Sequence, residues 1–167
     1  MIYFLFSALA LVVIMLVWKR AKKPYIHKNI SQPALSKFLE VLLFRGYDAG
    51  RLFITIPNEK KFLQFSKYID TNSSAGLRFN FPLADWSRSY YEPLKRALAN
   101  AGFELDIKPT GDDRIPEFTV VDLKHNLQSA LALALLVLKD IYGLNENDLV
   151  ELYFENVSPK DEKIGFG

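Results

Sequence analysis

The sequence has no cysteine, only two histidines, and few of the residues that interrupt regular structure, with eight Gly and eight Pro among 167 residues. The absence of cysteine excludes disulfides, a thiol nucleophile, iron–sulfur clusters and cysteine-ligated zinc. The low Gly and Pro content, together with 50% apolar residues, excludes a disordered, collagen-like or low-complexity chain. The length fits one domain, with or without an appendage.

Charged residues are also missing from the start of the chain. Residues 2–18 carry no charged side chain, and four cations follow at once: Lys19, Arg20, Lys22 and Lys23. A helix over these residues would be about 25 Å long, which is at the lower limit for crossing a bilayer. The pattern predicts a single transmembrane helix that contacts the lipid bilayer through this apolar run.

The residues that follow the run predict its orientation. Trp18 lies where an interfacial aromatic side chain would, and the four cations after it predict contact with anionic lipid headgroups, so these five residues form the expected membrane interface. The positive-inside rule then places the N-terminus outside and the following domain in the cytoplasm. Of the 21 cations, 17 remain for the rest of the chain against 19 acids. That balance does not support a nucleic-acid groove, so no nucleic-acid partner is expected.

The remainder of the chain changes between helical and strand patterns. Apolar residues recur at helical spacing in some segments and alternate with polar residues in others, as they do in strands. The predicted helices cover residues 35–43, 92–100 and 127–142, and the predicted strands cover residues 52–56, 77–81, 103–107 and 118–121. Residues 149–154 predict an extra C-terminal strand.

Residues 60–69 fit two patterns. Phe62, Phe65 and Ile69 have a helical spacing, whereas Leu63, Phe65 and Ile69 fit a strand that Lys67 interrupts. Periodicity alone leaves the choice open. With a strand there, the order is helix, three strands, helix, two strands, helix. This order predicts an α+β fold class, with a mainly antiparallel sheet and three packed helices after one N-terminal transmembrane helix.

These patterns divide the chain into four segments. We expect a transmembrane helix at residues 1–18, a basic juxtamembrane linker at 19–30, the α+β cytoplasmic domain at 31–157 and a flexible tail at 158–167.

The order of four short motifs resembles the superfamily of type III secretion chaperone-like and YbjN-like domains. The motifs are a strand with Gln between apolar residues (61–65), a turn and strand from Gly76 to Phe81, a helix that ends in Leu98-Ala99-Asn100-Ala101-Gly102-Phe103, and a long helix that ends in Leu138-Lys139-Asp140-Ile141-Tyr142-Gly143. The resemblance covers about residues 31–155. It implies that residues 60–69 form a strand and that the domain is a non-enzymatic binding module. Such domains often act as dimers, so a homodimer is one expectation.

Candidates for chemistry are few. Asp122 and His125 lie near a predicted helix start at a spacing that lets them meet, as a general base and its orienting group. The simpler interpretation is a helix cap beside a surface histidine. Asp112 and Asp113 supply far fewer oxygens than calcium requires, and a hairpin turn explains them. We therefore expect no catalytic residue, no metal site and no cofactor.

The best candidate for partner binding is an aromatic cluster in a Pro-bounded segment, formed by Trp86, Arg88, Tyr90 and Tyr91. Aromatic side chains with Arg are typical of interface anchors. The alternative is that Trp86 closes one end of the core.

The sequence thus predicts a membrane-anchored, non-enzymatic module, chaperone-like or scaffold, that binds an unknown protein and faces the cytoplasm. One alternative is a hydrolase of unknown substrate that uses Asp122 and His125. Another is an accessory subunit of a membrane complex that packs through its anchor helix.

Overall fold

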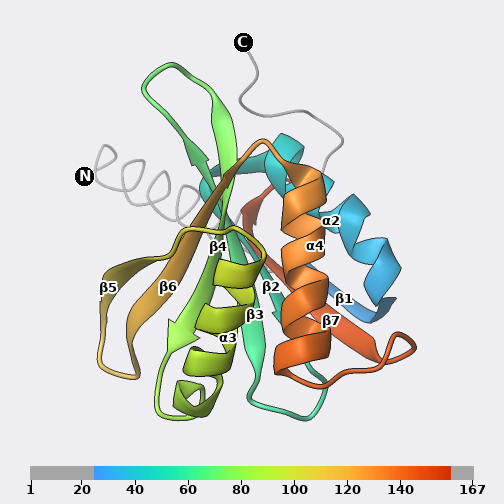
Figure 1. Ribbon diagram of the computed structural model, residues 1–167. Helices are drawn as coiled ribbons and strands as arrows, with labels where there is room; N and C mark the ends of the chain where they lie inside the picture. The colour runs from blue at the N-terminus through green and yellow to red at the C-terminus, as the bar shows by residue number, and fades with distance from the viewer. Residues whose placement is uncertain (1–24, 159–167) are drawn as a thin grey trace, which may run out of the picture.

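The structure, a computed structural model, describes residues 25–158 and is α+β. Its elements are β1 (Tyr25–Ser31), the 3-10 turn η1 (Gln32–Ala34), α2 (Leu35–Arg45), β2 (Gly46–Thr55), β3 (Phe62–Ile69), β4 (Ala75–Leu83), α3 (Arg88–Asn100), β5 (Asp106–Asp112), β6 (Ile115–Lys124), α4 (Leu127–Leu136), the π-helical turn η2 (Val137–Ile141) and β7 (Leu149–Val157). Figure 1 shows how they are arranged.

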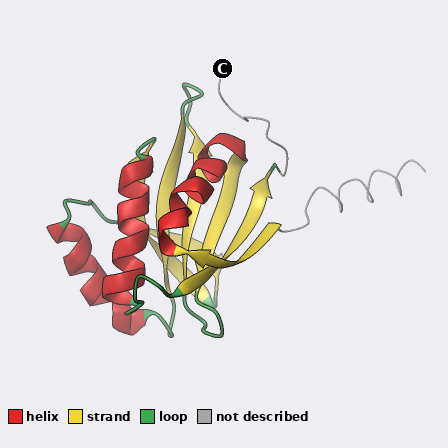
Figure 2. Cartoon of the chain, turned by 90° about the vertical axis from the view of Figure 1, so that its right-hand side faces the viewer, coloured by secondary structure: helices red, strands yellow, loops and turns green. Residues whose placement is uncertain are grey.

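All seven strands belong to one sheet with the order β1-β7-β2-β3-β4-β6-β5. Every neighbouring pair is antiparallel. The last strand of the chain, β7, lies between β1 and β2, so the two ends of the described chain meet in the sheet. Helices α2, α3 and α4 gather on one side of the strongly curved sheet (Figures 1 and 2).

The core lies between these helices and one face of the sheet. Cross-strand pairing brings Phe154, Leu52, Phe65, Phe79 and Val121 into one row across β7, β2, β3, β4 and β6. Each of the five is at most 2% exposed. Directly opposed apolar and aromatic pairs stabilise a sheet, and this row does so over five strands. We call it the core row.

Helix α4 is the central helix of this layer. Its start is fixed by Asn126, whose side-chain oxygen accepts a hydrogen bond from the Ser129 amide at 2.9 Å, as helix-capping residues do. Ala130, Leu133 and Ala134 are fully buried. The helix continues into η2 and ends at Gly143, whose φ of +78° suits glycine.

The structure corrects the expectation of a single-pass membrane protein with a cytoplasmic domain. Within residues 25–158, no helix combines the length and the apolar character that a bilayer crossing requires. The most apolar helix, α4, has 10 residues and η2 adds 5, whereas a span needs about 20. The fold class is thus corrected to a seven-stranded antiparallel sheet with three helices. The expected span, with Trp18, Lys19, Arg20, Lys22 and Lys23, lies outside the described residues.

Three expected boundaries also differ from the structure. The strand expected at residues 103–107 is β5, which begins at Asp106 and continues to Asp112. The second half of the expected linker forms β1, because its backbone pairs with β7; its side chains are mostly exposed, which hides the strand pattern. Helix α3 begins at Arg88, before the expected start near Glu92. Pro93 lies inside the helix on its exposed side, where the missing N–H removes one backbone hydrogen bond and the ring meets no packed neighbour.

Residues 62–69 form a strand, β3, and Lys67 faces the core from it. Lys67 is 1% exposed and its Nζ donates a hydrogen bond to the Gly46 carbonyl at 2.7 Å. Gly46 is the C-cap of α2, so the ammonium lies at the negative end of that helix. Burial lowers the pKa of Lys67, and the nearby Asp48 carboxylate partly opposes that shift. The lysine therefore breaks the apolar pattern without breaking the strand.

The Thr119 side chain on β6 generates a stability prediction. It is fully buried, and its Oγ1 has no hydrogen-bond partner. An unpaired buried hydroxyl costs free energy, and valine has nearly the same shape without it. We expect Thr119→Val to raise the free energy of unfolding by about 1 kcal/mol in urea denaturation. Thr119→Ser keeps the hydroxyl and loses a methyl group, so it should lower stability; equal effects of the two variants would contradict the assignment.

Candidate functional site

The sheet has a second face, opposite the helices, which we call the open face. Side chains alternate between the two faces along each strand, so the positions between core residues point to it. On β3 the core residues are Leu63 and Phe65, and the intervening open-face residues are Phe62, Gln64 and Ser66. No helix of the described chain covers this face in Figure 2.

Four aromatic side chains form a continuous row on the open face. The ring centroids of Tyr153 and Phe53 are 5.5 Å apart, those of Phe53 and Phe62 are 5.9 Å apart, and those of Phe62 and Trp86 are 5.5 Å apart. All four rings are half-buried. We call this set the aromatic row. Ile26, 53% exposed and paired with Tyr153 across the strands, extends it to the edge strand β1.

A second row of open-face side chains is charged and runs beside the aromatic row. Cross-strand pairing aligns Glu155, Arg51, Ser66, Arg78 and Asp122 across β7, β2, β3, β4 and β6. The Glu155 carboxylate lies 3.5 Å from the Arg51 Nε. We call this set the charge row. Each arginine thus has an acidic residue on its outer side, and the Ser66 hydroxyl lies between the two arginines.

Tyr68 closes the end of the charge row. The Arg78 guanidinium lies 4.0 Å from the centre of the Tyr68 ring, within cation–π range. The Tyr68 hydroxyl donates a hydrogen bond to Asp122 at 2.8 Å. Burial, followed by this hydrogen bond, raises the pKa of Tyr68 to about 12. The tyrosine thereby holds both the arginine and the carboxylate in place.

Gly76 makes room for this arrangement. A Cβ at Gly76 would lie 2.5 Å from the Tyr68 ring, so any larger residue would displace the tyrosine. The requirement here is space for the ring. The pairing of Gly76 with Tyr68 across the strands therefore explains why a glycine occurs inside β4.

Between these groups lies a hollow of about 380 Å³, which we call the polar hollow. Its lining includes Arg51, Gln64, Ser66, Tyr68 and Arg78. Gln64 is only 6% exposed, and its side-chain amide forms no hydrogen bond with any described residue. Its amide atoms still reach the surface of the hollow, because Thr119 Oγ1 is the one fully buried side-chain nitrogen or oxygen without a partner among the described residues. A polar group held at a hollow without a protein partner is a candidate ligand contact.

The residues predicted for partner binding do not form one surface. Trp86 packs on Phe62 and belongs to the aromatic row. Tyr90 contacts the nearly buried Tyr142 at 5.4 Å, on the helical side of the sheet. Arg88 is exposed and pairs with Asp85 at 3.4 Å, and Tyr91 is half-buried on α3. Whether these four residues bind a partner stays a prediction.

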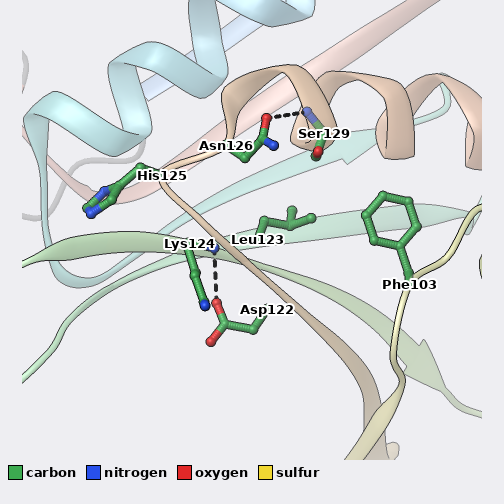
Figure 3. Close-up of a pocket in the computed structure, with 7 residues that line it drawn as sticks. All are labelled: Phe103, Asp122, Leu123, Lys124, His125, Asn126 and Ser129. Carbon is green, nitrogen blue, oxygen red and sulfur yellow. Dashed lines mark hydrogen bonds between the residues drawn. The ribbon is translucent and has the colours of Figure 1, made fainter.

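Asp122 and His125 line a separate hollow of about 520 Å³ (Figure 3). The Asp122 carboxylate accepts hydrogen bonds from the Tyr68 hydroxyl and from the Lys124 amide, the latter at 3.1 Å. The exposed His125 imidazole points away from it in Figure 3, and the two side chains form no hydrogen bond. The cap of helix α4 is Asn126 and not Asp122. The Asp122 carboxylate and the His125 imidazole are therefore not placed to transfer a proton between them.

Sequence reasoning missed most of the open-face site. Phe53, Phe62 and Tyr153 come from three strands, and only the register of β2 with β3 and β7 brings them together. Gln64 was visible as a polar residue among apolar ones, but the sequence did not show which face it occupies. Residues 25–158 contain no group of three or more His, Asp or Glu side chains placed to hold a metal ion.

Comparison with known proteins gives no match for this chain among protein-family models, curated proteins or solved structures. The resemblance to type III secretion chaperone-like and YbjN-like domains therefore stays a prediction.

The raised pKa of Tyr68 generates a pH prediction. An unfolded tyrosine ionises near pH 10, whereas folded Tyr68 stays protonated to about pH 12. Its contribution to stability is therefore present below pH 10 and is lost as the pH rises toward 12. We expect Tyr68→Phe to remove roughly 1–3 kcal/mol of the alkaline loss in the free energy of unfolding, measured in urea at pH 9 to 11.5.

Asp122→Asn is the matched control for this measurement. It keeps an oxygen for the Tyr68 hydroxyl and removes the negative charge, so the alkaline loss should lie between those of the parent chain and Tyr68→Phe. An unchanged pH slope in Tyr68→Phe would contradict the assignment.

Proposed function

We propose that this chain is a non-enzymatic protein-binding module, chaperone-like or scaffold, that takes an apolar segment of a partner protein on its aromatic row. The observation that carries the proposal is the continuous row of tilted and edge-to-face ring contacts, formed by Tyr153, Phe53, Phe62 and Trp86, across a sheet face that no described helix covers. In this proposal the helix-covered face of the sheet stabilises the fold, and the open face binds the partner.

The physical argument concerns the kind of side chain and how it is held. Tyr, Trp and Phe are enriched at the centres of protein interfaces, where well-packed anchors supply most of the binding energy. Each ring of the row is fixed by its neighbours, so little conformational entropy is lost when a partner binds. Ile26 and Leu149, 53% and 44% exposed, add apolar surface near the β1–β7 edge.

The other expectations gain less support. A hydrolase built on Asp122 and His125 is not favoured, because the two side chains point apart (Figure 3). The expected accessory subunit would pack through residues 2–18, which lie outside the described residues. The family resemblance of the sequence, which implies a binding module, agrees with the proposal.

The proposal is tested by selecting peptides from a random twelve-residue display library on the full chain. We expect selected peptides to carry aromatic or aliphatic residues and to bind with micromolar dissociation constants, measured by fluorescence anisotropy. Phe53→Thr keeps a strand-forming residue on β2 and removes one ring of the row. We expect it to weaken binding about tenfold or more, which is the loss typical of an interface anchor.

Tyr47→Thr is the matched control. It removes a 47% exposed aromatic side chain of the same strand, β2, that lies outside the aromatic row, and we expect it to leave the affinity within about twofold. Unfolding curves of both variants show whether they stay folded. The proposal fails if no peptide is selected, or if Phe53→Thr folds and binds as the parent chain does. Binding of a second copy of the chain, seen by sedimentation, would replace the partner segment with a homodimer.

A further inference from the structure

We infer that the polar hollow is a subsite for one carboxylate, carried by an Asp or Glu side chain of the partner segment. The inference rests on the proposed function, because it names the partner chemistry that would accompany the apolar contacts. It concerns different residues, however, so the two proposals can fail separately. Its basis is the juxtaposition of the Arg78 guanidinium and the unpaired Gln64 amide at one hollow.

Arg78 is the cation available to a ligand. Its guanidinium lies over the Tyr68 ring, 4.0 Å from the ring centre, and forms neither a hydrogen bond nor an ion pair with any described residue. Its cross-strand neighbour Asp122 accepts hydrogen bonds from Tyr68 and Lys124 instead. A guanidinium has five N–H donors. Arg78 is thus held beside Tyr68 with donors that no described residue uses.

Gln64 provides the second contact. Its neighbour Asn80 donates a hydrogen bond to the Ser66 hydroxyl at 2.8 Å, whereas the Gln64 amide has no such partner. The Gln64 residue is 6% exposed, and its amide atoms are not among the fully buried unpaired atoms of the described residues, so they keep a small accessible surface at the hollow. A ligand oxygen there would give the amide a hydrogen-bond partner. A carboxylate has two oxygens, one for the Arg78 fork and one for the Gln64 N–H₂ group.

The surrounding charges favour a ligand with a single negative charge. The lining of the hollow includes two open-face cations, Arg51 and Arg78, and one acid, Asp48, whose carboxylate accepts a hydrogen bond from the Ile69 amide. Lys67 also lines the hollow, but its ammonium faces the core and bonds the Gly46 carbonyl. Arg51 already pairs with Glu155. Among the described residues, Arg78 is then the one unpaired arginine at the hollow, and a flat ligand carboxylate with a single negative charge matches it. A phosphoryl dianion would be repelled more strongly by the Asp48 and Glu155 carboxylates.

Register sets the distance between the apolar and acidic contacts. Arg51 and Phe53 are two positions apart on the same face of β2, which corresponds to about 7 Å along a strand. On β2 the charge row therefore lies one such step from Phe53, and Arg78 continues that row two strands away, on β4. An extended partner segment with an apolar residue and an acidic residue two positions apart matches both rows.

The first experiment tests the hollow without any peptide. The full chain, labelled with ¹⁵N, is titrated with N-acetylaspartate amide, with the neutral N-acetylasparagine amide and with inorganic phosphate. We expect the Gln64 side-chain amide and the Arg78 Nε–H signals to shift saturably with the aspartate probe, with a dissociation constant on the order of millimolar. The asparagine probe should leave both signals unchanged. Equal shifts with both amides, or tighter binding of phosphate, would overturn the inference.

Two variants distinguish a ligand contact from a structural role. Gln64→Leu removes the amide and keeps a buried apolar shape, so it should retain or raise the melting temperature while it abolishes the aspartate-dependent shift of Arg78. Arg78→Lys keeps the charge and loses the flat fork, and we expect it to weaken binding of the probe about fivefold or more. Normal binding of the aspartate probe by folded Gln64→Leu would overturn the inference.

The second experiment separates this inference from the proposed function. Library selection is repeated on Arg78→Gln, which leaves the aromatic row intact. We expect acidic residues two positions from an apolar residue among peptides selected on the parent chain, and their loss on Arg78→Gln, with the apolar residues retained. Apolar selection without acidic enrichment on the parent chain overturns the carboxylate subsite and leaves the binding module standing. If no peptide is selected on the parent chain, the proposed binding module is overturned. The carboxylate subsite is still tested in that case by the titration with N-acetylaspartate amide.

The chain's own acids are the remaining source of a carboxylate. Asp161 and Glu162 lie outside the described residues. A full chain with Asp161→Asn and Glu162→Gln should bind the aspartate probe as the parent chain does. A gain of about tenfold in affinity would identify these residues as the occupant and overturn the inference of a partner carboxylate.

Discussion

The register of five antiparallel strands is the constraint on which the rest of the structure depends. Phe154, Leu52, Phe65, Phe79 and Val121 lie in one row under the helices, so each strand must keep its place relative to its neighbours. A slip by one residue in any strand would turn its buried side chains to the other face. The same register therefore also fixes what the open face presents. The aromatic and charge rows are consequences of a core that cannot shift.

The sequence predicts those strands in which apolar and polar residues alternate, because one face of the strand is buried and the other is not. Residues 52–56, 77–81 and 118–121 alternate because one side packs under helices, and they lie in β2, β4 and β6. The sequence does not predict β1, because β1 is an edge strand that pairs only with β7 and has mostly exposed side chains. Residues 60–69 stayed ambiguous because Lys67 looks like a surface residue, although its stem is buried and its ammonium bonds the Gly46 carbonyl.

The candidate site was harder to predict because it is assembled from residues distant in sequence. Composition around Trp86 indicated an aromatic anchor, but it also suggested Tyr90, which packs on Tyr142 on the helical side. The two residues are neighbours along the chain and lie on opposite faces of the sheet, since Trp86 packs on the open-face residue Phe62. The other three rings of the aromatic row come from β3, β2 and β7, and no local sequence pattern links them to Trp86. Pairing register, which no single segment encodes, decides their proximity.

Two polar residues, Gln64 and Asn80, lie nearly buried on the open face of the sheet. Gln64 and Asn80 are 6% and 7% exposed in the middle of the open face, where apolar residues would pack without an unpaired amide. Asn80 is paired with Ser66, whereas the Gln64 amide has no partner among the described residues and keeps a small accessible surface at the polar hollow. Partial burial also lowers the local dielectric, so a charge-assisted hydrogen bond to Arg78 would be stronger there than in water. Local conflicts of this kind concentrate where a protein binds something. The open face is therefore better explained as a surface built for a ligand with apolar and anionic parts than as a second, incomplete core.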